Sequence, residues 1–203
     1  MPSQNRQLAA IMFTDIVGYT ALMGHDERKA FDYLRKNREL QKPVIEEFGG
    51  KWIKELGDGV MASFKTVSDA VCAAIKIQEA VKNAKEFQLR IGIHQGEVVF
   101  EDNDVFGDAV NIAARIQSVA NPGSIYISES VFHIISNRKE INTRFIKEQP
   151  LKNVKTPVRV YEVLVGNEEP GAISTISTSP SAKNDGHPVA EKSIAVLPLI
   201  NMS

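Results

Sequence analysis

Two apolar segments, KWIKEL and VMASF, flank the tripeptide Gly57-Asp58-Gly59 and constrain the fold of this chain most strongly. The Asp-Gly pair is a strong signal for a tight turn between two antiparallel strands. The hairpin is also charged, because Lys54 and Asp58 lie four residues apart. An ion pair between them in an exposed hairpin would contribute about 0 to 1 kcal/mol, which is too little to explain charge at this place. The sequence therefore predicts a hairpin whose charged side chains bind a partner outside the turn.

Further strands and helices follow from the spacing of apolar residues. The run AAIMF ends near Asp15 as a buried strand would, and a strand over QLRIGIHQGEVVF contains Gly92 and Gly96, which predict a bend or a bulge. Helical spacing covers residues 26–48, residues 67–85 and GDAVNIAARIQSVA, whereas SIYISESV, TRFIKE and PVRVYEVL are typical of strands. Regular βαβ spacing is missing. We therefore expect an α+β sheet with packed helices rather than a Rossmann fold.

The composition excludes several classes of protein. With 203 residues, 43% of them hydrophobic, the chain can form one domain core and an appendage. Its 24 basic and 25 acidic residues give a net charge of -1, so no bulk charge attracts nucleic acid or an anionic membrane. The single cysteine, Cys72, favours a reducing compartment, and the sequence shows neither a membrane-spanning apolar run nor a signal-peptide core. The expected location is the cytoplasm.

Two aspartates, Asp15 and Asp58, each follow an apolar strand at a turn. If those strands are neighbours, the two carboxylates converge and offer the hard oxygen ligands that Mg²⁺ or Mn²⁺ needs beside substrate phosphates. Either aspartate taken alone has a simpler interpretation, Asp15 as a cap and Asp58 as a turn residue. A metal site becomes the favoured hypothesis when the pair is considered with other polar residues of the chain.

Those other residues include Asn111 and Arg115, which lie at i and i+4 and share one helix face. An amide and a guanidinium one turn apart suit a sugar oxygen and a phosphate, although a solvated polar stripe is the commoner case. Arg90 lies inside a strand, where it needs solvent or an anionic partner. His94, in the same strand, is expected to be a hydrogen-bonded structural residue without a catalytic role. The glycine-rich turns match neither a P-loop nor a dinucleotide fingerprint.

The composition changes after Val165. Residues 166–191 are rich in Ser, Thr, Pro and Gly, which is typical of a flexible linker. The last segment, KSIAVLPLINMS at residues 192–203, is apolar and strand-like. We expect a folded domain over residues 1–165, a linker, and the start of a truncated downstream domain from a longer protein.

Five blocks of the sequence, in order, resemble the class III nucleotidyl cyclase catalytic domain: FTDIVGYT, KELGDGVMASF, LRIGIHQGEVV, NDVFGDAVNIAARI and LKNVKTPVRVYEV. They cover about residues 8–165. The ending EKSIAVLPLINMS resembles the start of the TolB-like domain that follows cyclase domains in some long bacterial proteins. The resemblance implies a ferredoxin-like α+β sheet that acts as a head-to-tail homodimer with two active sites in its interface.

The resemblance also implies an adenylyl cyclase, which makes 3',5'-cyclic AMP and pyrophosphate from ATP. The family's metal-binding aspartates match Asp15 and Asp58, which would hold two Mg²⁺ or Mn²⁺ ions in each active site. The family's adenine-reading pair matches Lys54 and Asp104, so ATP is expected over GTP. In such a dimer Lys54 and Asp58 would contribute to different active sites.

Four more residues match functional positions of the family. By this resemblance Asn111 orients the ribose and Arg115 stabilises charge at the α-phosphate. Arg90 matches an arginine linked to phosphate binding. Lys152 matches the triphosphate-binding lysine, with Lys155 as an alternative.

Two other functions stay open, a non-catalytic nucleotide-binding regulatory or dimerisation module and a guanylyl cyclase. The complete set of matching catalytic residues argues against the first function, and Lys54 and Asp104 argue against the second. Phe106 and Asp108 depart from the residues that the family often has before the catalytic helix.

Overall fold

The computed structural model describes residues 6–150 and 157–166 of the chain. Strands and helices alternate along this part in an irregular order. Their bounds are β1 Arg6–Ile16, α1 Tyr19–His25, α2 Glu27–Glu47, β2 Lys51–Leu56, β3 Gly59–Phe64, α3 Val67–Ala84, β4 Leu89–Glu101, β5 Asp104–Phe106, α4 Asp108–Ser118, β6 Ile125–Ser128, α5 Glu129–Ile135, β7 Thr143–Gln149 and β8 Val158–Val163.

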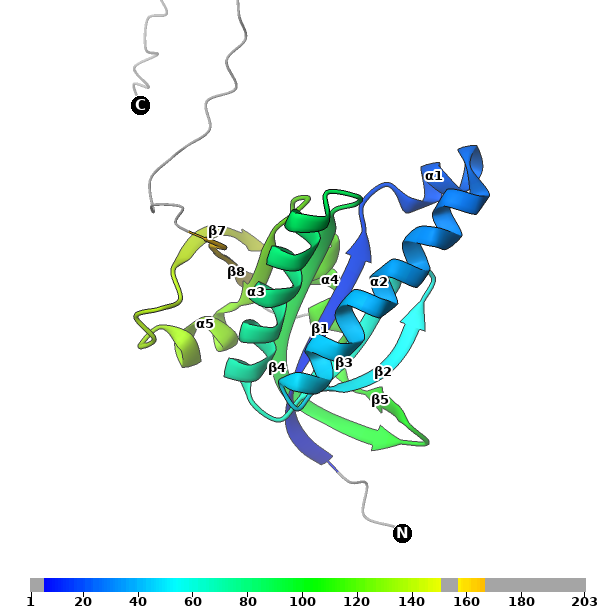
Figure 1. Cartoon of the computed structure of the whole chain (residues 1–203). Helices are drawn as coiled ribbons and strands as arrows, with labels where there is room; N and C mark the ends of the chain where they lie inside the picture. Colours follow the sequence, from blue (N-terminus) through cyan, green and yellow to red (C-terminus); the bar gives the residue numbers. More distant parts are fainter. Residues whose placement is uncertain (1–5, 151–156, 167–203) are drawn as a thin grey trace, which may run out of the picture. The chain divides into compact units, whose positions relative to one another are not determined.

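The described strands form one mixed sheet (Figure 1). Seven of them follow the order β2-β3-β1-β4-β6-β8-β7, and β5 pairs with β4 outside this path. Only β4 and β6 run parallel within the described sheet, and its other neighbours are antiparallel. The predicted α+β fold is confirmed. The predicted hairpin is the β2–β3 pair, whose turn contains Gly57 at a φ of 65°.

The two faces of the sheet are covered differently. Helices α2, α3 and α5 pack on one face and enclose the larger apolar core, whereas α4 covers the other face together with β5 (Figure 1). Side chains alternate along β1, so Met12 and Ile16 belong to the larger core while Ile11 and Phe13 belong to the core beneath α4. Asp15 therefore lies at the end of the face that α4 covers.

Helices α2 and α3 begin and end at the signals that the sequence provides. The side chain of Asp26 accepts a hydrogen bond from the backbone N–H of Lys29 at 3.0 Å, and Thr66 caps α3 through the N–H of Asp69 at 3.1 Å. After α2 the chain turns at Gly49, whose φ of 66° favours glycine. The helices predicted at residues 26–48 and 67–85 are thus confirmed to within about one residue.

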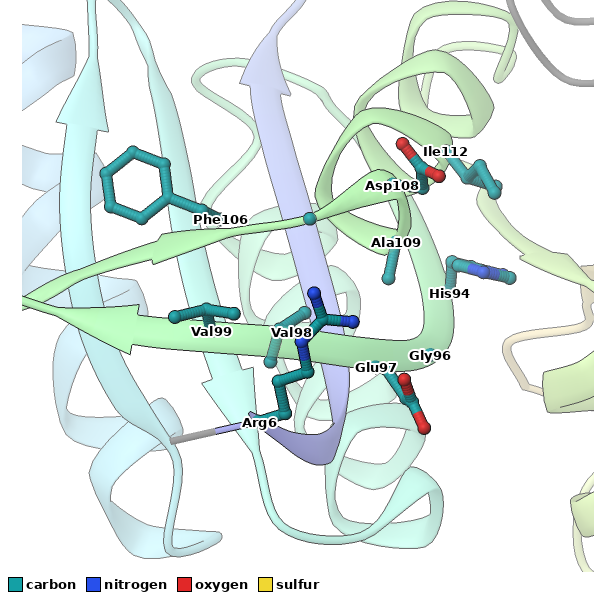
Figure 2. A pocket seen from close by; sticks show the side chains of 11 residues that line it. Arg6, His94, Gly96, Glu97, Val98, Val99, Phe106, Asp108, Ala109 and Ile112 are labelled. Atoms are coloured by element: carbon teal, nitrogen blue, oxygen red, sulfur yellow. The ribbon is translucent and has the colours of Figure 1, made fainter. Parts of the chain in front are cut away.

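Gly92 and Gly96 let α4 approach β4 closely. A Cβ atom on Gly92 would lie 2.2 Å from the backbone nitrogen of Gln117, and one on Gly96 would lie 2.8 Å from the Cβ of Ala109. The register between β4 and β1 is unbroken, so the predicted bulge is absent from this pair. The ribbon of β4 does curve near Gly96 (Figure 2). The glycines are needed mainly because a helix backbone packs against the strand.

Three local predictions were incomplete. The segment SIYISESV is a strand only to Ser128, after which α5 begins. Neither α1 nor the short strand β5 was predicted, because α1 has seven residues with no side-chain cap and β5 has only three residues. Such short elements are stabilised by tertiary contacts more than by local sequence.

Several predictions lie outside the described residues. They include the roles of Lys152 and Lys155, the linker at residues 166–191 apart from Gly166, and the downstream segment at residues 192–203. Among the helices that the structure does describe, none has both the length and the apolar character needed to cross a membrane.

Candidate active site

Asp15 and Asp58 meet at one end of the sheet. Asp15 is the penultimate residue of β1, and Asp58 lies in the turn of the β2–β3 hairpin. Because β3 pairs with β1, with Val60 opposite Thr14, the turn lies beside the end of β1. The Asp58 carboxylate accepts a hydrogen bond from the backbone N–H of Ile16 at 3.2 Å. The structure therefore brings together the two carboxylates that the strand ends predicted.

The electrostatics of this end of the sheet suit a cation. Partial burial, and then the negative charge of Asp15, raise the pKa of Asp58 to about 6. The guanidinium of Arg90, which lies opposite Asp15 in the β1–β4 ladder, forms an ion pair with the Asp15 carboxylate. The buried Nε of Arg90 has no hydrogen-bond partner among the described residues. We call Asp15, Asp58 and Arg90 the metal cluster, after the role proposed for the two aspartates below. The cluster combines crowded negative charge with an unsatisfied guanidinium donor.

A divalent cation fits the two carboxylates if other ligands complete its coordination. Within residues 6–150 and 157–166, no group of three or more His, Cys, Asp or Glu side chains could hold a metal ion. Mg²⁺ is commonly bound by one or two carboxylates together with water and substrate phosphates. The donor set is therefore appropriate for a metal ion that completes its coordination with water or with substrate phosphates, and Arg90 adds a donor of the type that binds phosphate.

Lys54 and Asp104 form a second cluster, which we call the purine pair after the role proposed for it below. The ammonium of Lys54, on β2, lies 2.5 Å from the carboxylate of Asp104, the first residue of β5. This hydrogen bond from Lys54 is the main cause that keeps the pKa of Asp104 below its usual value. Lys54 therefore does not pair with Asp58, and the two charged residues of the hairpin have different partners.

Helix α4 carries the other two predicted residues. Ala109, Ala113 and Ile116 are buried against the sheet, so Asn111 and Arg115 lie on the opposite side of the helix, where Asn111 is exposed. The predicted sharing of one helix face is confirmed. Beside the start of α4 is a cavity of about 510 Å³, whose lining includes Arg6, Phe106 and Asp108 (Figure 2).

The predicted site residues do not form one pocket in a single chain. None of the seven that the structure describes lines the cavity in Figure 2. Asp58 borders a hollow of about 10 Å³, which is about the space of one water molecule. Within the described residues, no hydrogen bond or ion pair joins the metal cluster to the purine pair. In the described part of the chain, the two clusters are therefore not joined by a direct polar contact.

His94 has the structural role that the sequence predicted. Its Nδ1 lies 2.8 Å from the hydroxyl of Ser128, and burial lowers its pKa to about 4. The imidazole is therefore neutral at neutral pH, and it lines the cavity beside α4 (Figure 2).

Sequence reasoning missed a buried polar chain behind the metal cluster. Thr14 donates a hydrogen bond to the amide oxygen of Gln41 at 3.0 Å, and the Gln41 amide nitrogen donates to Asn37. The signal was present in the sequence, because Asn37 and Gln41 fall within the apolar spacing of α2 between Leu34 and Val44. Polar residues at such core positions need partners, which the sequence alone does not name.

Known proteins share the sequence pattern and the fold of this chain. Residues 1–164 match the family model described as adenylate and guanylate cyclase catalytic domain. The chain is 33% identical over 99% of its length to "Putative adenylate cyclase 3" of Rhizobium meliloti, and 31% identical over 75% of its length to an adenylate cyclase of Anabaena cylindrica. It spans 35% and 36% of the lengths of these two relatives. A crystal structure of an adenylate/guanylate cyclase/hydrolase from Silicibacter pomeroyi superposes with a TM-score of 0.75 at 36% identity, covering 80% of this chain and 99% of that one.

Proposed function

Because the chain belongs to the adenylate and guanylate cyclase catalytic domain family, we propose that it is an adenylate cyclase, which converts ATP to 3',5'-cyclic AMP and pyrophosphate. The observation that carries the choice of substrate is the purine pair, an ammonium and a carboxylate held side by side. Adenine presents a ring-nitrogen acceptor next to an amine donor, which a lysine and an aspartate can bind. Guanine presents a donor and a carbonyl acceptor at these positions, so the same pair would meet guanine with mismatched groups.

The metal cluster supplies the acidic ligands of the reaction. Asp15 and Asp58 would hold two divalent cations, Mg²⁺ or Mn²⁺. Such ions, when bound there, would lower the pKa of the ribose 3'-hydroxyl and neutralise charge on the triphosphate. A bond forms between the 3'-oxygen and the α-phosphorus, the bond from that phosphorus to pyrophosphate breaks, and the hydroxyl proton is lost to solvent. Arg90 lies beside Asp15, where its guanidinium would bind a phosphate oxygen of the substrate.

The remaining residues position the substrate. Asn111 would orient the ribose, and Arg115 would stabilise the charge that develops at the α-phosphate. We assign the triphosphate-binding role to Lys152, with Lys155 as the alternative. These roles follow from the match to the family motifs and from the shared exposed side of α4.

We propose that two copies of the chain assemble each active site. Among the described residues no hydrogen bond or ion pair joins the metal cluster to the purine pair, and a head-to-tail homodimer would place the metal cluster of one copy opposite the purine pair of the other. Because the interface of such a dimer is self-complementary, two equivalent sites result. Lys54 and Asp58 of one hairpin would then contribute to different sites.

The substrate assignment is tested by incubating the purified chain with Mn²⁺ and either ATP or GTP. We expect cyclic AMP and pyrophosphate in equal amounts from ATP, with a much lower kcat/KM for GTP. A higher kcat/KM for GTP would identify a guanylate cyclase. Nucleotide binding without either product at high protein concentration would favour the non-catalytic regulatory module.

The dimer is tested by mixing Lys54→Ala and Asp58→Ala chains, each nearly inactive alone. In a mixed dimer the intact metal cluster of one chain meets the intact purine pair of the other, so one of its two sites works. Random exchange should therefore restore about a quarter of wild-type activity. A mixture that stays inactive, despite subunit exchange demonstrated with tagged chains, would exclude the shared sites.

A further inference from the structure

Three polar side chains form a buried chain between helix α2 and strand β1. The exposed fractions of Asn37, Gln41 and Thr14 are 2%, 0% and 1%. Hydrogen bonds run from the Thr14 hydroxyl to the Gln41 oxygen and from the Gln41 nitrogen to the Asn37 oxygen. This relay, as we call the three side chains, ends one residue before Asp15.

Packing alone gives no reason for polar side chains here. The relay lies among apolar residues of the larger core, including Met12, Ile45 and Val60. Burying polar groups costs desolvation free energy, and hydrogen bonds between them only approximately offset that cost. Apolar side chains of similar shape would be about equally stabilising, because replacing all partners together is often nearly neutral. The relay must therefore serve a purpose that depends on its geometry.

The segment held by the relay supports both metal-cluster carboxylates. Asp15 follows Thr14 directly, and the N–H of Ile16 donates to the Asp58 carboxylate. A Cβ on Gly59 would lie 2.8 Å from the carbonyl oxygen of Thr14, so the turn that carries Asp58 lies directly against Thr14. A shift of Thr14 would therefore move both carboxylates relative to each other.

We propose that the relay of Asn37, Gln41 and Thr14 positions the Asp15 and Asp58 carboxylates and thereby sets their affinity for divalent cations. The proposal rests on the proposed function of these two aspartates as metal ligands. Thr14, Gln41 and Asn37 touch neither substrate nor metal, so they are positioning residues. Residues that orient metal ligands commonly change metal affinity by about 10- to 100-fold when they are replaced.

The experiment compares Mn²⁺ binding, by electron paramagnetic resonance of the free ion, with thermal unfolding. The matched pair is Thr14→Val, which removes the hydroxyl but keeps the shape, and Thr14→Ser, which keeps the hydroxyl. We expect Thr14→Val to raise the Kd for Mn²⁺ by about tenfold and Thr14→Ser to keep the wild-type Kd. Ser63→Ala, which removes another buried hydroxyl on β3, should also keep the wild-type Kd.

A triple variant, Thr14→Val with Asn37→Leu and Gln41→Met, removes all polar partners at once. We expect it to unfold at about the wild-type temperature and yet to bind Mn²⁺ about tenfold more weakly, with a lower kcat and a nearly unchanged KM for ATP. Wild-type Mn²⁺ affinity in both the triple variant and Thr14→Val would overturn the positioning role.

Asp58→Asn separates this failure from a failure of the proposed function. If wild-type protein and Asp58→Asn bind Mn²⁺ equally, Asp58 is not a metal ligand, and this result contradicts both its proposed function and the relay proposal. If Asp58→Asn binds Mn²⁺ weakly while the relay variants bind it as the wild type does, only the relay proposal is contradicted.

Discussion

The metal cluster and the purine pair are supported in different ways. The Asp58 carboxylate accepts a hydrogen bond from the backbone of β1, and Asp15 forms an ion pair with Arg90 on the neighbouring strand. Lys54 and Asp104 meet between the hairpin and the short strand β5, with side chains 40% and 28% exposed. Under the proposed function the metal cluster would hold the ions that act at the reacting atoms, whereas the purine pair would bind the base. We therefore expect larger effects on catalysis from changes in the first region.

The largest effect is expected from Asp58→Asn. This change keeps a hydrogen-bond acceptor for the Ile16 N–H but removes the charge, so kcat should fall by roughly 100- to 1000-fold in Mn²⁺ and ATP. The measurement is cyclic AMP formation at saturating ATP. Asp102→Asn, at an exposed residue between β4 and β5, is the control and should keep normal activity. Normal activity in Asp58→Asn would show that this carboxylate has no part in catalysis. It would contradict the larger effect expected for the metal cluster.

Lys54→Met should have the next largest effect. Loss of the ammonium leaves adenine without its donor, so we expect kcat/KM for ATP to fall by about 100-fold while the value for GTP changes little. Assays with ATP and with GTP give the ratio of the two kcat/KM values. The control is Lys51→Met on the same strand, where the lysine contacts Asn103 at 3.5 Å. A uniform loss with both nucleotides would mean that Lys54 does not read the base.

A smaller effect is expected from pH, through His94. Strand β4 carries Arg90 at one end and pairs with Asp104 at the other, and His94 lies between them. Because burial lowers its pKa to about 4, the unfolded chain binds a proton more tightly than the folded chain. His94 therefore stabilises the fold above about pH 6.5, and this stability is lost as the pH falls towards 4.

Urea unfolding at two pH values measures this effect. Between pH 7.5 and pH 5, wild type should lose about 2 kcal/mol more of its free energy of unfolding than His94→Gln does. Glutamine can retain a hydrogen bond to Ser128 but does not titrate. If the free energies of unfolding of the two proteins changed equally with pH, folding would not lower the pKa of His94.

The smallest effect concerns the stability contributed by the purine pair. Because both side chains are substantially exposed, Lys54→Met should change the free energy of unfolding by about 1 kcal/mol or less. Urea denaturation of the variant and of Lys51→Met provides the measurement. A loss of free energy of unfolding well above that value would show that the purine pair contributes substantially to stability. The two regions would then not differ in the way that we expect.

Much of the fold could be predicted from local sequence. The sequence around Asp58 predicted the β2–β3 hairpin, although its two turn residues are Gly57 and Asp58 and Gly59 already belongs to β3. Caps at Asp26 and Thr66 determined where α2 and α3 begin. Local patterns also placed Asp15 and Asp58 at strand ends, and Asn111 and Arg115 on one helix face. These features depend on backbone preferences and on the periods of strand and helix, which act over a few residues.

Only the tertiary structure decided which side chains meet. Lys54 pairs with Asp104, 50 residues away, and Arg90 pairs with Asp15, 75 residues away, because of the order in which the strands join the sheet. The partner of Gln41 likewise depends on α2 packing over β1. Local patterns contain no information on strand order, so the sequence by itself determined the elements and the types of charged residue. Packing of distant elements decided that Lys54 meets Asp104 and that Asp58 lies beside the end of β1, so the two charges of the hairpin have different partners.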